Sequence, residues 1–342
     1  MRKTTATLFA ALLNFGLLLP PLTHAQNYRK LAQTGFQFLS VGTEARAAAM
    51  ADAFTTVAGY SNSIYYNPAN LARSNAFLDV ALSRNQWIAD IVYNAGSLAV
   101  RPAGGEFGTF AVSLLSVDYG DFLGTRVDQT TDEGYVDTGV FSPTAYAVGL
   151  GYAKSLSDRF SVGGHVKYTS QALGSSALPV GNAAGGVTED VKNELGTFAF
   201  DFGTFYQTAI KSLAFGMTVR NFSQEVEFQR ESFQLPLTFR IGISMNVLDF
   251  FMAENREHSF LVSIDAIHPR DYSEQLNIGG EYTFKKLIAV RGGYFYNYDE
   301  QDLTAGFGIQ KFSGTRGFAI DYAYTPFGVF DSVSRFTVRF SL

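Results

Sequence analysis

From residue 77 onward, large apolar residues recur at every second position of the chain. The stretch 235–245 shows the pattern most clearly. Leu, Phe, Ile and Met occupy its odd positions, and Thr, Arg, Gly and Ser occupy the even positions from 238 on. A period of two places alternate side chains on opposite faces of a β-strand. The pattern therefore predicts a chain built mainly from strands that each have one bulky apolar face.

The opposite face of these strands is small and polar. Gly, Ala, Ser and Thr dominate it, together with single charges of both signs. A soluble sandwich would expose polar faces rich in Lys and Glu and would need protected sheet edges. Small polar residues instead suit the crowded lumen of a transmembrane barrel whose bulky face contacts lipid. We therefore predict an all-β membrane protein.

The alternation divides into separate segments, most of them close to the ~9–11 residues that a tilted membrane strand needs. It predicts an antiparallel transmembrane β-barrel of about fourteen strands that occupies residues 77–342. The predicted strands are 77–84, 91–100, 108–117, 145–154, 159–170, 197–207, 213–221, 235–246, 258–267, 275–284, 287–296, 303–311, 316–325 and 334–342.

The connectors between these segments differ in length at the two ends of the predicted barrel. The three longest, 118–144, 171–196 and 222–234, all fall at one end, whereas tight turns such as 155–158 and 285–286 fall at the other. Outer-membrane barrels have short periplasmic turns and longer external loops. The asymmetry supports an even strand count, and it predicts a periplasmic N-terminus and extracellular long loops.

Residues 1–25 have the pattern of a secretory signal peptide. Arg2 and Lys3 precede an apolar core, and Ala25 ends a cleavage site of the small-x-small type. The alternative is an N-terminal anchor helix. It is disfavoured because the apolar stretch is shorter than the ~20 residues of a membrane span and ends at Pro20. Export and the strand pattern together predict a location in the outer membrane.

Residues 26–76 break the alternation. The stretch 43–55 reads as a helix with Thr43 as its N-cap, because an Ala-rich run follows. Farther on, Asn67 is expected to cap a short helix with Pro68 at its first position, where a missing N–H costs nothing. We predict that this segment is a small helical plug in the barrel lumen; the alternative is a periplasmic extension.

Composition and charge exclude some classes of partner. The chain has no Cys, so no disulfide can form, and its net charge is −5. Removal of a signal peptide that holds only basic charges would make it more acidic. A nucleic-acid partner would favour a basic face. The predicted surroundings are therefore outer-membrane lipid, with no nucleic acid.

Residues that could carry catalysis or bind a metal are sparse. Apart from one His in the predicted signal peptide, the chain has His165, His258 and His268. The last two flank the predicted strand 258–267 and so cannot converge on one site. No Cys/His cluster suggests a metal, and no Gly-rich loop opens a helix as a phosphate site should. We predict that the protein is not an enzyme and has no cofactor.

The long connectors differ in character. The connector 118–144 carries an acidic cluster whose spacing matches no EF-hand, so a solvated loop is the simpler interpretation. The cluster consists of Asp121, Asp128, Asp132, Glu133 and Asp137. The connector 171–196 is rich in Gly and Ser in its middle part and is predicted to be a flexible lid or partner contact. Phe222, Phe228 and Phe233, in or beside the connector 222–234, would suit an apolar ligand.

Charged residues of both signs fall on the predicted lumen faces. We expect them to pair with one another or with the plug residues Arg46 and Asp52, because an unpaired charge away from water is costly. They would then hold the plug and fill the lumen; the alternative is an ion-selective path. These residues are Lys167, Asp201, Arg220, Arg240, Asp265, Glu281, Arg291, Asp321 and Arg339.

Three blocks of the N-terminal segment resemble a known family. They are FQFLSVG at 36–42, EARAAAMADAF at 44–54 and SIYYNPANLA at 63–72. In this order and spacing the blocks resemble the N-terminal pattern of the PorV/PorQ family of outer-membrane proteins. The chain departs from that pattern at Ala51, where Gly is usual after Met, and at Tyr66, where Trp is common.

The resemblance implies a FadL-like barrel of fourteen strands with an N-terminal hatch in the lumen. It also implies association with type IX secretion, in which members of the PorV branch bind the C-terminal domains of secreted cargo. Three functions stay open: a protein that binds cargo or secretion-machinery partners, a FadL-type transporter of hydrophobic small molecules, and a structural barrel.

Overall fold

The computed structural model describes residues 33–179, 188–228, 231–251 and 257–342. The signal peptide predicted at 1–25 lies outside the described residues.

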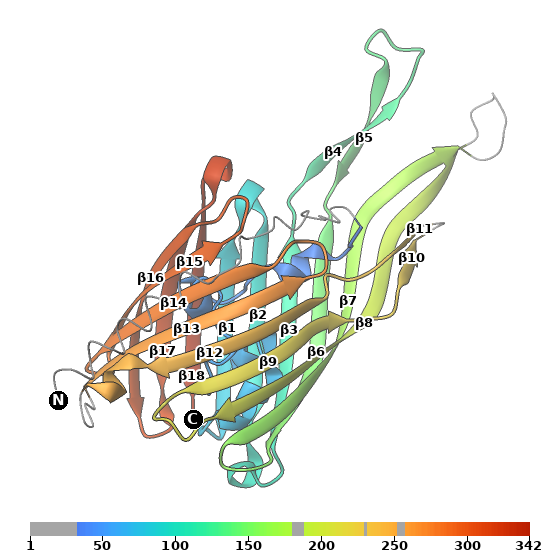
Figure 1. Cartoon of the computed structure of the whole chain (residues 1–342). Coiled ribbons are helices and arrows are strands. Elements are labelled where there is room, and N and C mark those ends of the chain that lie inside the picture. Colours follow the sequence, from blue (N-terminus) through green and yellow to red (C-terminus); the bar gives the residue numbers. More distant parts are fainter. Residues whose placement is uncertain (1–32, 180–187, 229–230, 252–256) are drawn as a thin grey trace, which may run out of the picture.

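The wall is a closed barrel of antiparallel strands in which the first strand pairs with both the second and the last (Figure 1). The predicted count of fourteen strands is confirmed. The strands are β1 (Leu78–Gln86), β2 (Val92–Val100), β3 (Thr109–Asp118), β6 (Thr144–Ser155), β7 (Phe160–Pro179), β8 (Thr188–Gln207), β9 (Ala214–Phe222), β12 (Thr238–Asn246), β13 (His258–Pro269), β14 (Gln275–Phe284), β15 (Ile288–Tyr296), β16 (Leu303–Ser313), β17 (Arg316–Pro326) and β18 (Ser332–Ser341).

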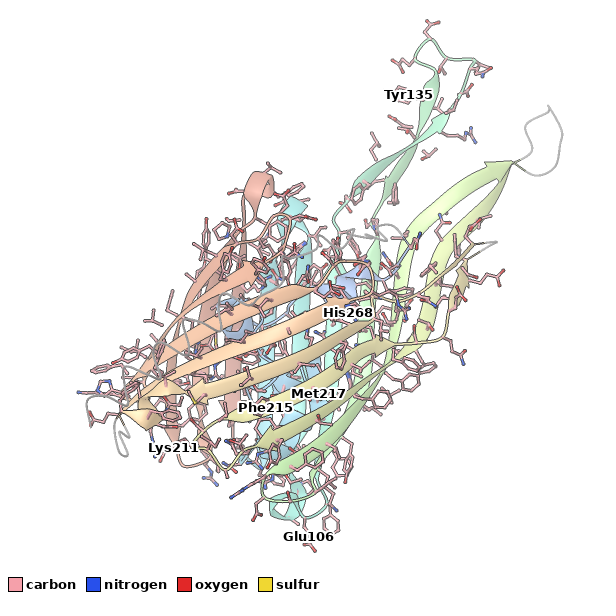
Figure 2. The ribbon with its side chains drawn as sticks, in the orientation of Figure 1. Glu106, Tyr135, Lys211, Phe215, Met217 and His268 are labelled. Carbon is pink, nitrogen blue, oxygen red and sulfur yellow. The ribbon has the colours of Figure 1, made fainter. Side chains whose placement is uncertain are left out.

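Burial follows the alternation along the wall. In β3 every second residue is buried, and the residues between them, such as Phe110 and Leu114, are exposed on the outside. Phe215 and Met217 of β9 lie on the same outer surface (Figure 2). Exposed Phe, Leu, Ile and Tyr over the whole outer wall would be unfavourable in water and are favourable against lipid.

The two ends of the barrel differ, and we call them the long-loop end and the short-turn end. At the short-turn end the strands are joined by connectors such as 156–159 and 285–287. At the long-loop end, β4 (Phe122–Val127) and β5 (Tyr135–Phe141) form a hairpin that stands beyond the wall (Figure 1). A second, shorter hairpin consists of β10 (Val226–Phe228) and β11 (Glu231–Phe233).

The prediction of a flexible loop over 171–196 was wrong for its described part. β7 and β8 continue beyond the barrel and pair with each other up to Pro179 and Thr188. The register shifts between Ala172 and Ser175, where Gly174 has a φ of 92°. This irregularity interrupts the alternation, which explains why sequence reading ended the strand too early. Residues 180–187 lie outside the described part.

Residues 34–76, here called the lumen segment, lie within the barrel. Four short helices shape the segment: η1 (Gln37–Ser40), α2 (Ala45–Ala48), η2 (Ser61–Tyr65) and η3 (Pro68–Arg73). Wall glycines on several sides touch it. An added Cβ would lie 2.5 Å from Pro68 if placed at Gly163, and 2.5 Å from Met50 if placed at Gly279. Only Gly leaves room for so close an approach.

The predicted helix 43–55 was wrong in length and in its cap. The helical turn α2 covers only Ala45–Ala48, and its N-cap is Glu44, with no capping bond from a side chain. Ala51 and Asp52 have φ values of 52°, which end the helix. Tertiary contacts prevail over the helix propensity of the Ala-rich run, because the backbone N–H groups of Phe54 and Thr55 donate to Asp265 of β13 and not to a helical partner.

Short helices also occur in connectors: η4 (Ile88–Asp90), η5 (Pro102–Gly105), η6 (Val247–Phe250) and η7 (Gly328–Phe330). Within the described ranges, none of the helices has the length and apolar character needed to cross a membrane.

Candidate functional site

Four charged side chains form a continuous chain of ion pairs between the lumen segment and the wall. Arg46 donates from two nitrogens to the two oxygens of Glu281, both at 2.7 Å. Arg291 donates to Glu281 at 2.5 Å and to Asp321 at 2.7 Å. We call Arg46, Glu281, Arg291 and Asp321 the paired cluster. Because its charges alternate, every buried charge in it faces an opposite one.

Strand register explains how the wall part of this cluster forms. Glu281 of β14 lies directly opposite Arg291 of β15. Asp321 lies on β17, so Arg291 must reach across β16 to contact it. Gly308 makes this possible, because a Cβ there would lie 2.1 Å from the Asp321 carboxylate and 2.7 Å from the Arg291 guanidinium.

Glu44 and Tyr60 of the lumen segment meet Arg339 of β18. The guanidinium carbon of Arg339 lies 4.5 Å from the ring centre of Tyr60, whose hydroxyl donates to one oxygen of Glu44 at 2.8 Å. The other Glu44 oxygen is buried and has no partner among the described residues. Burial raises the pKa of Glu44 to about 7, so this carboxyl binds a proton near neutral pH.

Two further predicted residues fix turns of the lumen segment. Asp265 of β13 accepts hydrogen bonds from the backbone N–H groups of Phe54 and Thr55, both at 2.9 Å. Asn67 caps η3 by accepting from the Ala69 N–H at 3.1 Å, and Pro68 follows at the first helical position. These contacts satisfy backbone donors that the bent chain leaves without helical partners.

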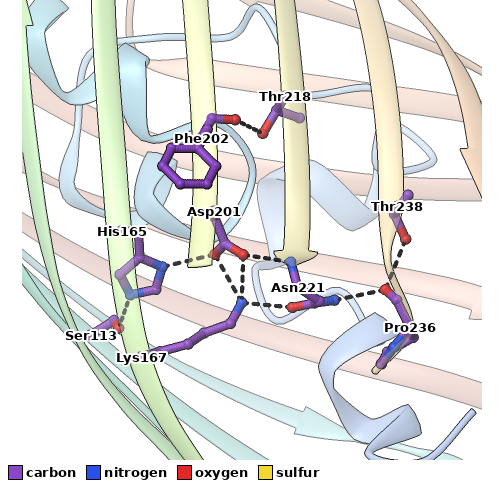
Figure 3. Close-up of polar contacts among 9 residues, drawn as sticks. All are labelled: Ser113, His165, Lys167, Asp201, Phe202, Thr218, Asn221, Pro236 and Thr238. Carbon is purple, nitrogen blue, oxygen red and sulfur yellow. Dashed lines mark hydrogen bonds and ion pairs between the residues drawn. The ribbon is translucent and has the colours of Figure 1, made fainter. Parts of the chain in front are cut away.

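Lys167 and Asp201 lie in a second buried network, on β7 and β8 (Figure 3). Asp201 accepts from Lys167 at 2.8 Å, from the backbone N–H of Asn221 at 2.7 Å, and contacts His165 Nδ1 at 2.9 Å. The strand register shifts at this point, between Phe200 and Phe202. This register shift is a β-bulge, and it leaves the Asn221 N–H without a partner on the neighbouring strand. The Asp201 carboxylate accepts from that N–H instead.

Sequence reading missed that Ser113, His165 and Asp201 lie in a row. The Ser113 hydroxyl lies 2.8 Å from His165 Nε2, an order of side chains that can activate a serine. The cavity beside them has a volume of about 30 Å³, and Ser113 is only 3% exposed. Such a space holds a water molecule but no acyl substrate. We therefore interpret the row as a structural network.

The remaining histidines do not contribute to this network. His258 and His268 lie at opposite ends of β13. His258 contacts the Tyr282 hydroxyl at 2.7 Å, and His268 lies 3.3 Å from Glu274. In the part of the chain that the structure describes, no three His, Cys, Asp or Glu side chains are arranged to hold a metal ion.

Arg220, Arg240 and Asp52 are near one another without forming a paired cluster. Arg240 donates to the backbone oxygen of Asp52 at 3.2 Å. The Nε groups of Arg220 and Arg240 are buried and lack a hydrogen-bond partner among the described residues. Arg335 of β18, which sequence reading did not single out, joins them and donates to the Gly42 carbonyl at 3.2 Å. The alternation of the C-terminal strand puts Arg335 on the polar face, and this was the sequence signal that could have identified it.

A family model described as "Type IX secretion system protein PorV" matches residues 24–255, which is more than half of the chain. The chain belongs to the PorV family. The match covers the lumen segment and the wall as far as β12. It confirms the resemblance that the N-terminal motifs indicated. None of the curated proteins matches this PorV-family chain.

Solved structures of outer-membrane transporters share the fold. The toluene transporter TbuX of Ralstonia pickettii is 14% identical, with a TM-score of 0.55 over 87% of this chain and 97% of TbuX. A FadL homologue of Pseudomonas aeruginosa is 12% identical, with a TM-score of 0.52 over 88% of this chain and 99% of the homologue. At this identity the likeness concerns the fold: the PorV-family chain is a FadL-like outer-membrane barrel.

Proposed function

We propose that this PorV-family barrel is a binding component of a type IX secretion pathway. In this proposal the hairpins at the long-loop end contact secreted cargo or other components of the secretion machinery. The observation that carries the proposal is an exposed apolar face on the β4–β5 hairpin, in a chain whose family serves protein secretion.

The apolar face comes from paired positions of the hairpin. Leu123 lies opposite Val140, and Val127 lies opposite Tyr135. These four side chains are 62%, 67%, 79% and 46% exposed, respectively. The hairpin stands beyond the barrel end, with Tyr135 near its tip (Figure 2). Exposed apolar patches rimmed by polar residues mark interaction sites. Exposed acidic residues at the tip, such as Asp132 and Glu133, favour a partner with basic groups.

The orientation and the plug belong to the same proposal. We place the long-loop end outside the cell and the short-turn end in the periplasm, with residues 1–25 removed as a signal peptide and residues 26–76 acting as the plug. The paired cluster supports the plug, because opening the lumen would separate Arg46 from Glu281. A barrel closed in this way presents binding surfaces rather than a passage.

Transport of a hydrophobic small molecule is the second candidate. It is supported by aromatic residues at the long-loop end of the lumen, where Trp87 lies 5.0 Å from Phe327 between ring centres. TbuX, which shares the fold, is described as a toluene transporter. We favour the secretion role, because a continuous path through the lumen would have to displace residues of the lumen segment that are fully buried, such as Met50 and Ile64.

Co-purification from detergent extracts of the source cells tests the proposal. The tagged wild-type protein should recover secreted proteins that share a β-rich C-terminal domain. The double variant Leu123→Asp/Val140→Asp should lose them. Val329→Asp is the matched control, because Val329 is an exposed apolar residue of η7 at the same end, 84% exposed. A purified barrel that carries a hydrophobic small molecule and recovers no such proteins would contradict the secretion role.

A further inference from the structure

A cavity of about 430 Å³ lies at the long-loop end of the lumen. The lumen segment borders it between Gln37 and Gly42, and strands of the wall surround it. The connectors that line its upper part, such as 298–301, join strands at the long-loop end. The cavity is therefore entered from that end and is large enough for a small organic molecule.

Three arginines form the deep part of this cavity, and we call them the arginine floor. Arg220, Arg240 and Arg335 come from β9, β12 and β18 and all line it. Arg335 donates hydrogen bonds to the Gly42 carbonyl and to the Thr325 hydroxyl, both at 3.2 Å. Arg220 forms no hydrogen bond or ion pair with any described residue, and its buried Nε lacks a partner. The floor therefore offers donors without matching acceptors.

The acidic residues of the cavity are distributed differently. The Asp271 carboxylate is already engaged by Thr34 at 2.8 Å and by Gln37 at 2.7 Å. Asp299 and Glu300 belong to the connector between β15 and β16 and are exposed at the mouth. Among the described residues that line the cavity, Asp52 is the acid beside the floor, where its carboxylate accepts from the Tyr66 hydroxyl at 3.4 Å. Asp201, which also attracts Arg220, is already engaged by Lys167 and by the Asn221 N–H. The cavity thus has a positive floor and a negative mouth.

Aromatic side chains provide an apolar wall between floor and mouth. Trp87 lies beneath the Arg335 guanidinium, with 5.2 Å between the guanidinium carbon and the ring centre. Phe327 packs against the same indole, and Phe295 packs against Tyr298 with 4.8 Å between ring centres. A ligand that matches this cavity has an apolar body between an anionic and a cationic end.

We infer that this cavity binds a short apolar peptide with free termini, with its carboxylate on the arginine floor and its ammonium group at the acidic mouth. The guanidinium groups of Arg220 and Arg240, which line the cavity, would meet the carboxylate oxygens. Guanidinium groups suit carboxylates because their planar donors match both oxygens. The inference is independent of the proposed role in secretion and goes beyond it.

Trp87 provides the measurement, because it is the only tryptophan of the chain. The purified barrel is titrated with the tripeptide Gly-Phe-Leu while tryptophan emission is recorded, and calorimetry on the same samples supplies a second measurement. Two matched ligands are the C-terminal amide and the N-acetyl form of this tripeptide. We expect saturable binding of the free peptide, at least about tenfold weaker binding of the amide, and a smaller, several-fold weakening for the N-acetyl form.

Variants locate the two charge contacts. In Arg220→Gln the free peptide and its amide should bind with similar affinity, whereas Arg159→Gln, at an exposed position of the short-turn end, should behave as wild type. Arg240→Gln serves as a second floor variant if Arg220→Gln does not fold. In Glu300→Gln the free peptide and its N-acetyl form should bind with similar affinity. Absence of saturable binding, equal binding of peptide and amide by wild type, or binding indifferent to N-acetylation would overturn the inference.

Discussion

Two of the charged groups in the lumen, the paired cluster and the arginine floor, are built on opposite principles. In the paired cluster, each acid contacts at least one base, and two arginines share Glu281. In the arginine floor, Arg220 and Arg240 lie near each other and have buried Nε groups without partners. Removing a partner from a buried ion pair leaves an uncompensated charge, whereas removing an unpartnered charge relieves repulsion. The first group therefore stabilises the fold, and the second is available for a ligand.

The largest effect is expected when the paired cluster is broken. Glu281→Gln would leave Arg46 and Arg291 facing each other in a buried place, and should lower the free energy of unfolding by ~3–5 kcal/mol. Urea unfolding in lipid vesicles, followed by the gel mobility of folded and unfolded barrel, measures the change. Glu106→Gln, at an exposed position, is the control. Equal stability of the two variants would show that the pairs do not stabilise the barrel.

A smaller loss is expected when the wall is pushed away from the lumen segment. A Cβ at Gly163 would lie 2.5 Å from the Pro68 backbone, whereas a Cβ at the neighbouring Gly164 would have nothing closer than 3.9 Å. Gly163→Ala should cost ~1–3 kcal/mol through overpacking, and Gly164→Ala should cost far less. The same unfolding measurement compares them. If Gly164→Ala proves as harmful as Gly163→Ala, the close approach is not the cause.

The buried Glu44 predicts a dependence of stability on pH. Its pKa is raised from 4.5 in the unfolded chain to about 7, mainly by burial, so the folded protein binds the proton more tightly. The stabilisation that this bound proton gives the folded state is complete below pH 4.5 and is lost as the pH rises through about 7. Glu44→Gln should remove this dependence and be more stable than wild type at pH 8, by up to about 3 kcal/mol.

Unfolding curves of wild type and Glu44→Gln at pH 5 and pH 8 test this expectation. Glu133→Gln, at an exposed position of the β4–β5 connector, should keep the pH dependence of wild type. The proposed role of Glu44 would be contradicted if wild type were more stable at pH 8 than at pH 5 and Glu44→Gln showed the same pH dependence.

The smallest effect concerns the arginine floor. Arg220→Gln should change the free energy of unfolding by less than ~1 kcal/mol, in either direction, because no ion pair is lost. Arg46→Gln, the same substitution in the paired cluster, should be strongly destabilising. A large loss of stability in Arg220→Gln would mean that Arg220 has a structural partner, and the contrast between the two groups would fail.

Sequence alone predicted the wall well, because lipid on one side and a crowded lumen on the other impose a strict period of two. It failed where that period is interrupted. The β4–β5 hairpin contains a register shift next to Gly124, and the ends of β7 and β8 follow the irregularity at Ala172. Such segments pair through their backbones without an alternating pattern of side chains.

The charged lumen residues could be identified by their face, but not by their partners. Which of them meet depends on strand register and on a gap such as Gly308, through which Arg291 reaches Asp321. Neither is visible in a single sequence. The row from Ser113 to Asp201 spans β3, β7 and β8 and escaped notice for the same reason.

Contacts between the lumen segment and β18 constrain the order in which the molecule can assemble. The backbone N–H of Ala45 donates to Thr337, 292 positions later in the chain, and Gly42 accepts from Arg335. This segment precedes the whole wall in the chain, and it therefore completes its contacts only when β18 arrives. Contacts of such long range are slow to form, and until then the unpaired edges of β1 and β18 can associate with other chains. We expect this barrel to need an assembly factor that protects both edges until closure.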